Sequence, residues 1–256
     1  MKRIKAIALK PYLLVFSCAC IFIILSSFKL GVFKASTSKK QVNFPVISLV
    51  PSLAIADIEV QKYFVVLTLR NDSDKAITAF SLSESGVNSR SEMIGSDRIM
   101  APGAIKTTLC GLPSPTSPEK GITILAVVYE DGTSEGDPKY IKQIFDARAG
   151  TQAQLTRILP LFRDALVTPK TMSLVQKQEA IKLKLEQLPE EEEEGQSLEF
   201  RVGLHDEKER AMNNLKELER IEQERGEDIA RRVLPIMVNT YEKRNLAVLN
   251  SLKQAR

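Results

Sequence analysis

Residues 127–141 read VVYEDGTSEGDPKYI, and along the chain this stretch marks the change from strand to helix. The residues before it form a β-branched apolar run, whereas the residues after it follow helical spacing. Asp131-Gly132 is a preferred pair for a two-residue type I′ hairpin turn. Asp137-Pro138 is typical of a helix N-cap followed by proline at the first helical position. We therefore expect the stretch to close a hairpin and then to begin a helix.

The same stretch also has the composition of a weak cation site. Calcium loops place oxygen ligands at alternate positions, and Asp131, Thr133, Glu135 and Asp137 alternate in this way. However, the two glycines have the wrong offsets, and no glutamate follows at position twelve. A strand also precedes the loop where an EF-hand needs a helix. A structural turn is favoured, and a cation site at Asp131, Glu135 and Asp137 is the alternative.

Upstream of this stretch, residues 44–137 contain short β-rich runs separated by turn residues. Five runs read as strands: LAIADIEV (53–60), KYFVVLTLRN (62–71), AITAFSLS (76–83), AIKTTLCGL (104–112) and ITILAVVYE (122–130). In the second run, Val65, Leu67 and Leu69 point one way, but both faces are apolar, which is typical of a central strand. Five to seven strands at this spacing predict an antiparallel β-sandwich, similar in architecture to immunoglobulin-type or fibronectin-type modules.

Downstream, residues 138–256 have helical periodicity. Four helical segments are predicted: one that begins at Asp137 and has Gly150 as its weak point, then about 171–188, about 204–234 and 236–252, the last two separated by Pro235. Pro189 and the glutamates that follow it make an acidic break over 189–197. The third segment has a thin apolar stripe among many charges. This pattern favours an intramolecular helical bundle, with self-association or a protein partner bound through helices 204–252, as in a short coiled coil, as the alternative.

The amino-terminal segment differs from the rest in charge and hydropathy. Residues 1–40 contain eight basic side chains and no acidic one, leaving 28 basic against 32 acidic side chains in the remainder. Residues 11–28 carry no charge and, as a helix, would reach roughly 27 Å, about the hydrocarbon thickness of a bilayer. We therefore expect a membrane anchor over 1–34 with its apolar core at 11–28, followed by a linker at 35–43. A cleaved signal peptide is the alternative.

Residues with catalytic potential are few. His205 is the sole histidine, so neither a serine–histidine–aspartate triad within one chain nor a site with several histidines can form. Cys110 lies in a predicted strand and reads as an inert buried thiol. Asn71-Asp72-Ser73 fits the N-glycosylation pattern, although a turn between strands explains it equally. Glu190 to Glu194 read as a solvated linker. No catalytic or cofactor-binding residue is predicted.

The predicted fold class is α+β, with an N-terminal transmembrane helix, an antiparallel β-sandwich and an α-helical C-terminal region. We expect a membrane-anchored, non-enzymatic binding or scaffolding protein of the cell envelope. It would be a single-pass protein that contacts the bilayer through residues 11–28, with most of the chain outside the cytoplasm. Nucleic acid is not expected as a partner, because the chain after residue 40 is net acidic. The alternatives are a carboxylate-dependent hydrolase with a site between sandwich and helices, a secreted soluble protein, and an anchored assembly factor that faces the cytoplasm.

Overall fold

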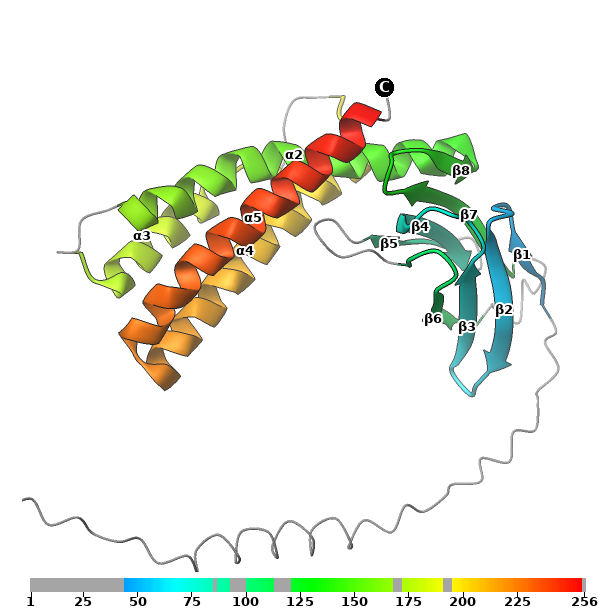
Figure 1. The fold of residues 1–256 in the computed structure, drawn as a ribbon, viewed down its shortest axis with the longest axis horizontal. Helices are drawn as coiled ribbons and strands as arrows, with labels where there is room; N and C mark the ends of the chain where they lie inside the picture. The colour runs from blue at the N-terminus through cyan, green and yellow to red at the C-terminus, as the bar shows by residue number, and fades with distance from the viewer. Residues whose placement is uncertain are drawn as a thin grey trace, which may run out of the picture. The chain divides into compact units, whose positions relative to one another are not determined.

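The computed structural model describes residues 44–84, 87–92, 100–112, 121–167, 172–190 and 195–254. The chain divides into two units, Met1–Ser38 and Lys39–Arg256, and all of the described residues lie in the second unit. The apolar run at 11–28 and the linker predicted at 35–43 therefore lie outside the described residues. The second unit is α+β, with two sheets and four helices among these residues (Figure 1).

The three-stranded sheet has the order β2 (Leu53–Val60), β3 (Phe64–Asn71), β6 (Ile105–Gly111). The five-stranded sheet has the order β1, β7, β4, β5, and β8 also pairs with β7. Its strands are β1 (Val46–Ser48), β4 (Ile77–Glu84), β5 (Val87–Glu92), β7 (Ile122–Tyr129) and β8 (Ser134–Gly136). The five predicted runs correspond to β2, β3, β4, β6 and β7. The strands β1, β5 and β8 were missed because they are short or polar.

The two sheets enclose an apolar core, as expected for a sandwich. Val65, Leu67 and Leu69 of β3 are fully buried, so the side that they share in the alternating pattern faces the core. They meet Phe80 of β4 and Ile124 of β7 from the other sheet. β3 lies between β2 and β6, as predicted for a central strand, but its second face, with Phe64 and Val66, is only half-buried.

The strand order explains how the sandwich is connected. The chain crosses from one sheet to the other between β3 and β4, between β5 and β6 and between β6 and β7. The sheets are not wholly antiparallel as predicted, because β1 pairs in parallel with β7, with Val46 opposite Ile122. The last strand, β8, has three residues and leads directly into a helix.

The hairpin between β7 and β8 is one residue longer than predicted. Gly132 N–H donates to the Tyr129 carbonyl at 3.1 Å, and Tyr129 N–H donates to the Thr133 carbonyl at 2.9 Å. Gly132 has φ +79°, in the left-handed region. This is a three-residue loop, a type I turn closed by a glycine bulge, so the predicted type I′ turn at Asp131-Gly132 is wrong.

The helices are α2 (Pro138–Val167), α3 (Leu174–Glu186), α4 (Leu198–Arg225) and α5 (Glu227–Gln254). The predicted second segment is confirmed as α3, which begins with a capping box between Ser173 and Gln176. The last break falls at Gly226 rather than at Pro235. Pro235 lies exposed inside α5, where water can bind the carbonyl that its missing N–H leaves free.

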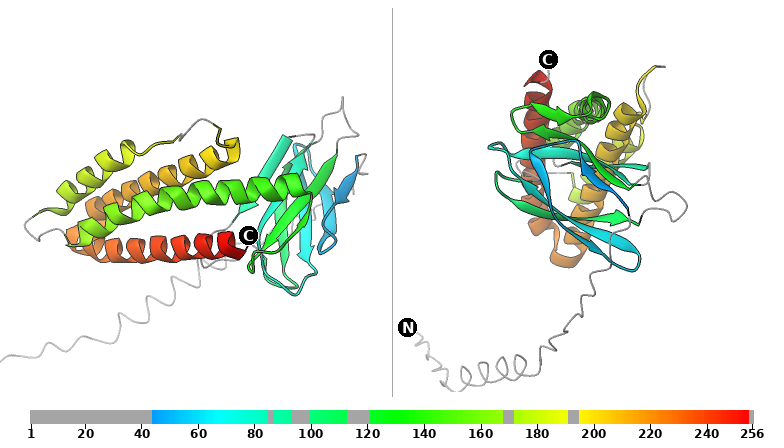
Figure 2. Two further views of the ribbon diagram at one scale, coloured as in Figure 1. Left: turned by 90° about the horizontal axis from the view of Figure 1, so that it is seen from above. Right: turned by 90° about the vertical axis from the view of Figure 1, so that its right-hand side faces the viewer.

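Gly150, predicted as a weak point, lies inside the continuous helix α2, at the place where α4 crosses it. A Cβ on Gly150 would lie 2.0 Å from the Phe200 carbonyl oxygen, and a Cβ on Gly203 would lie 2.1 Å from the Ala147 carbonyl oxygen. The two backbones can approach this closely only because both residues are glycines. Figure 2 shows α2 running beside α4 and α5 and continuing onto the sheet.

The bundle of α2 to α5 has an apolar core of its own. It includes Leu155 and Phe162 of α2, Leu215 and Leu218 of α4, and Tyr241 of α5, whose ring stacks on Phe162 with centroids 5.1 Å apart. The predicted apolar stripe of the third segment is thus buried within the chain over Leu204, Ala211, Leu215 and Leu218. A partner of these helices would have to bind elsewhere on them.

No helix among the described residues is long and apolar enough to cross a membrane. The predicted fold class with a transmembrane helix is corrected to α+β with two sheets and four helices, and the predictions of a signal-anchor and of a single-pass membrane protein are corrected with it. The described helices have apolar stripes for packing against one another and charged side chains on their other faces, as α4 shows with fourteen charged residues of 28.

Candidate functional site

The carboxylates of the 129–137 stretch have separate partners within the protein. Asp131 Oδ2 lies 2.7 Å from Lys75 Nζ, and Asp131 Oδ1 accepts hydrogen bonds from the Thr133 backbone N–H at 3.0 Å and hydroxyl at 2.6 Å. The hydrogen bonds from Lys75 and Thr133 lower the pKa of Asp131 to about 2. Both of its oxygens therefore have partners, Oδ1 within the turn and Oδ2 at Lys75.

Glu135 and Asp137 have structural partners as well. Glu135 Oε2 accepts the hydroxyl of Ser52 at 2.6 Å, and that hydroxyl also lies in a short hydrogen bond with Tyr129. Asp137 Oδ1 accepts the Lys139 N–H at 2.8 Å, in the manner of an N-cap to α2. Within the described ranges, no group of three or more potential metal ligands is present. The geometry favours the structural interpretation of Asp131, Glu135 and Asp137 over the cation site.

The possible glycosylation site at Asn71 is part of the core. Its side chain is fully buried, and its amide donates to the carbonyls of Lys75, Met100 and Ala101 at 2.8–3.2 Å. The side-chain oxygen accepts from Ser73. An amide enclosed in this way cannot accept a glycan without unfolding, so the predicted turn explains the sequence pattern.

The lone histidine and the described cysteine have the surroundings expected of them. Cys110 is buried, and burial together with the nearby Glu84 carboxylate raises the pKa of its thiol to about 12, so it is a poor nucleophile. His205 is exposed, with Nδ1 3.2 Å from Glu190 Oε2. Glu190 also pairs with Lys208 at 2.9 Å, and this lysine is the first cause of its lowered pKa. Residues 191–194 of the acidic run lie outside the described ranges.

Sequence patterns gave no sign of a buried carboxylate in the bundle. Glu207 is fully buried between α4 and α5, and its Oε2 accepts from Arg244 Nε at 2.9 Å. Arg210 lies 3.6 Å from the same oxygen, while Oε1 has no hydrogen-bond partner among the residues that the structure describes. Burial raises the pKa of Glu207 in spite of both arginines. Its spacing to Arg210 is that of any exposed helix pair, so only the tertiary structure reveals the burial.

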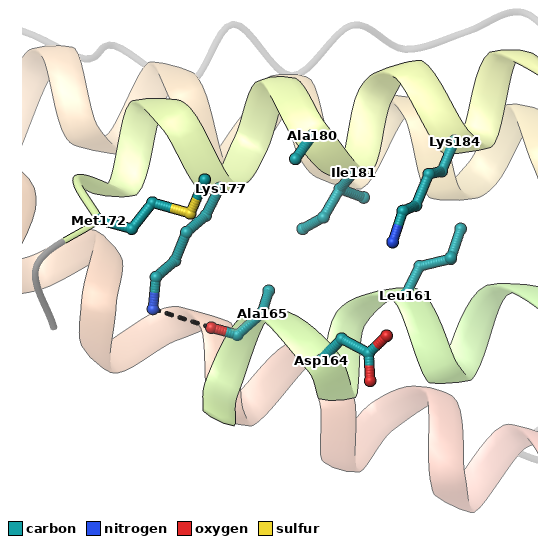
Figure 3. A pocket seen from close by; sticks show the side chains of 8 residues that line it. All are labelled: Leu161, Asp164, Ala165, Met172, Lys177, Ala180, Ile181 and Lys184. Atoms are coloured by element: carbon teal, nitrogen blue, oxygen red, sulfur yellow. Dashed lines mark hydrogen bonds between the residues drawn. The ribbon is translucent and has the colours of Figure 1, made fainter. Parts of the chain in front are cut away.

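A small cleft lies between the end of α2 and α3, with a volume of about 60 Å³ (Figure 3). Lys177 enters it from α3 and donates from Nζ to the Ala165 carbonyl at 3.0 Å. Asp164 and Lys184 also line the cleft, with Met172 and Ile181 as apolar neighbours. The lysine contact ties α3 to the last turn of α2, where a cation interacts favourably with the helix dipole. A cleft of this size holds no more than one or two waters.

The outer faces of the two sheets have opposite surroundings. On the five-stranded sheet, Ala79, Ala126 and Val128 form the covered sheet face, which is packed against Ile144 and the neighbouring apolar residues of α2. Arg148, also buried, donates to Thr78 at 2.9 Å beside this contact. The interface between sheet and helix is therefore mostly apolar and structural.

The outer face of the three-stranded sheet has large apolar side chains in solvent. Because Val65, Leu67 and Leu69 point inward, the alternate residues of β3 and their cross-strand partners on β2 and β6 point outward. We call this surface the exposed sheet face; it comprises Asp57, Glu59, Phe64, Val66, Thr68, Arg70, Ile105, Thr107 and Leu109. Ile105 is 64% exposed and Leu109 is 65% exposed. Leu109 lies directly opposite Val66, so apolar groups adjoin across the strands.

Comparison of the chain with protein-family models, with curated proteins and with solved structures gives no match.

Proposed function

We propose that the chain is a non-enzymatic binding or scaffolding protein that binds another polypeptide through the exposed sheet face. The observation that carries this proposal is the exposure of Ile105 and Leu109 on one sheet face, where Leu109 lies opposite Val66. Adjoining exposed apolar side chains rimmed by polar groups are typical of protein interaction sites. Asp57 and Glu59 of β2 and Arg70 of β3 border these apolar side chains, and Thr107 lies between Ile105 and Leu109.

The acidic side chains of the exposed sheet face favour a protein over a nucleic acid. Asp57 and Glu59 of β2 are exposed on this face, and their charge would repel phosphates. The carboxylate-dependent hydrolase receives no comparable support. Among the carboxylates that the structure describes, Glu207 is the one whose pKa is raised, and it lies between α4 and α5 rather than between the sheets and the helices.

Site-specific photocrosslinking tests the proposal, in cells of the organism that naturally produces the protein. A benzophenone amino acid replaces Thr107, which lies between Ile105 and Leu109 on β6, in the full chain. We expect irradiation to give a discrete polypeptide adduct. The additional substitution Leu109→Lys should remove this adduct, because it places a charge in the apolar contact.

The matched control is Leu246→Lys, because Leu246 lies on α5 and is 58% exposed. This change should leave the adduct from position 107 intact. An adduct that persists with Leu109→Lys, or an irradiated chain that forms no discrete adduct, would contradict the proposal.

A further inference from the structure

The register of the three-stranded sheet divides the exposed sheet face into an acidic side and an apolar side. Glu59 of β2 lies opposite Val66 of β3, which in turn lies opposite Leu109 of β6. One step along, Asp57 lies opposite Thr68. Since neighbouring strands are about 4.8 Å apart, the two acids form a row about 10 Å from the apolar row of β6.

The acidic row is not neutralised within the described part of the chain. Asp57 and Glu59 are both exposed, and neither has an ion pair there; Glu59 accepts a hydrogen bond from Gln61 Nε2 at 3.1 Å. Arg70 lies at the other end of β3 and donates from Nη2 to Asp72 at 3.0 Å. Lys62, in the β2–β3 turn, lies over the Tyr63 ring at 4.8 Å.

We propose that the exposed sheet face binds a polypeptide segment that is apolar on one side and basic along one flank. Its apolar side chains would contact Leu109, Ile105 and Val66, while lysines or arginines on the flank would pair with Asp57 and Glu59. This inference rests on the proposed function and specifies the chemistry of its partner. Long basic side chains suit this surface because their stems can cover the apolar row while their charges reach the acids.

A second copy of the same face is a poorer occupant. In a two-fold contact with aligned strands, an axis along the strands places the acidic row of β2 over the apolar row of the second β6. An axis across the strands places the acids over their own counterparts. The first arrangement desolvates carboxylates against apolar groups, and the second brings like charges together. A basic segment avoids both costs.

Fluorescence anisotropy with two labelled synthetic peptides tests the inference on the full chain. One peptide is a 14-residue amphipathic helix of leucine and lysine, and the other has glutamate in place of every lysine. We expect the lysine peptide to bind and the glutamate peptide to bind at least about tenfold more weakly. The double variant Asp57→Asn/Glu59→Gln should weaken the lysine peptide about three- to tenfold, and added salt should reduce this difference.

The control for charge is Asp206→Asn/Glu209→Gln, which removes two exposed acids of α4 and should leave the affinity unchanged. Leu109→Lys should abolish binding, whereas Leu246→Lys should not. Loss of binding in Leu109→Lys with equal affinity for both peptides would overturn the basic partner but leave the proposed function standing. No effect of Leu109→Lys would overturn both. A dimer in sedimentation that Leu109→Lys dissociates would overturn the basic partner in favour of a second copy.

Discussion

The outer faces of the two sheets differ in what covers them: a helix packs on one, and the other has large apolar side chains in solvent. The covered sheet face has small residues, Ala79 and Ala126, over which the apolar residues of α2 pack. The exposed sheet face has large apolar residues, Ile105 and Leu109, with nothing described over them. Small residues let a helix approach a sheet closely, whereas large exposed ones offer area to a partner. The first face stabilises the fold, and the second is available for binding.

The largest expected effect falls on the covered sheet face. Ile144→Ala removes a fully buried side chain between α2 and the sheet. We expect the free energy of unfolding to fall by about 2–5 kcal/mol, because the contact loses buried area and leaves a cavity. Urea denaturation followed by circular dichroism measures it. A loss below about 1 kcal/mol would show that α2 does not cover this face in solution.

The second largest loss of stability is expected at the crossing of α2 and α4. Gly203→Ala places a methyl group where the Ala147 carbonyl oxygen would lie 2.1 Å away, so the helices must separate. We expect a loss of about 1–3 kcal/mol in the same denaturation measurement. Gly226→Ala is an informative contrast, since a Cβ there meets nothing within 4 Å and any cost would come from its φ of +90°. Equal stability of wild type and Gly203→Ala would contradict the close approach.

The N-cap that begins α2 should have a smaller effect. Asp137→Ala removes the acceptor of the Lys139 N–H, and we expect a loss of about 1 kcal/mol. Asp137→Asn keeps an acceptor and should lose less. Calcium should leave the melting temperature of the wild type unchanged, because Asp131, Glu135 and Asp137 already have partners in the protein. A rise of the melting temperature with calcium would restore the cation site.

Asp131, in the hairpin before α2, should have the smallest effect on the free energy of unfolding, and this effect should depend on pH. Asp131 has its pKa lowered from 3.8 to about 2 in the folded chain. A lowered folded pKa gives stability that is present above the unfolded value and is lost as the pH falls toward the folded value. The advantage of wild type over Asp131→Asn should therefore persist above about pH 4 and vanish by about pH 2. Both side chains of the Asp131–Lys75 pair are about 40% exposed, so the advantage is small. An advantage that grows on acidification would contradict this sign.

Local patterns predicted the regular elements well and their partners poorly. The alternation in β3 and the helical spacing of apolar residues in α3 depend on neighbouring residues, and both elements formed where predicted. The break at Gly226 was missed because Pro235 gave the stronger sequence signal for a helix end. Pro235 faces solvent, and at such a position a proline can lie inside a helix. Gly150 was predicted as a weak point of the helix because its function, the close approach of α2 to α4, also depends on Gly203, which lies more than 50 residues away.

The candidate site was missed for a similar reason. AIKTTLCGL shows alternation, but no residue in it reveals whether a helix covers its outer face. That depends on where α2 packs, and α2 covers β4 and β7 instead. The burial of Glu207 likewise depends on Arg244, which lies 37 residues further along the chain.

The most direct test of this comparison is the free energy of unfolding of the full chain with one lysine placed on each sheet face. Val128→Lys should destabilise by several kcal/mol or prevent folding, because a charge would be buried under α2. Leu109→Lys should change stability by less than about 0.5 kcal/mol, because its side chain already lies in solvent. A loss of 2 kcal/mol or more for Leu109→Lys, of the size expected for a core residue, would mean that the exposed sheet face is packed within the chain and is not available to a partner.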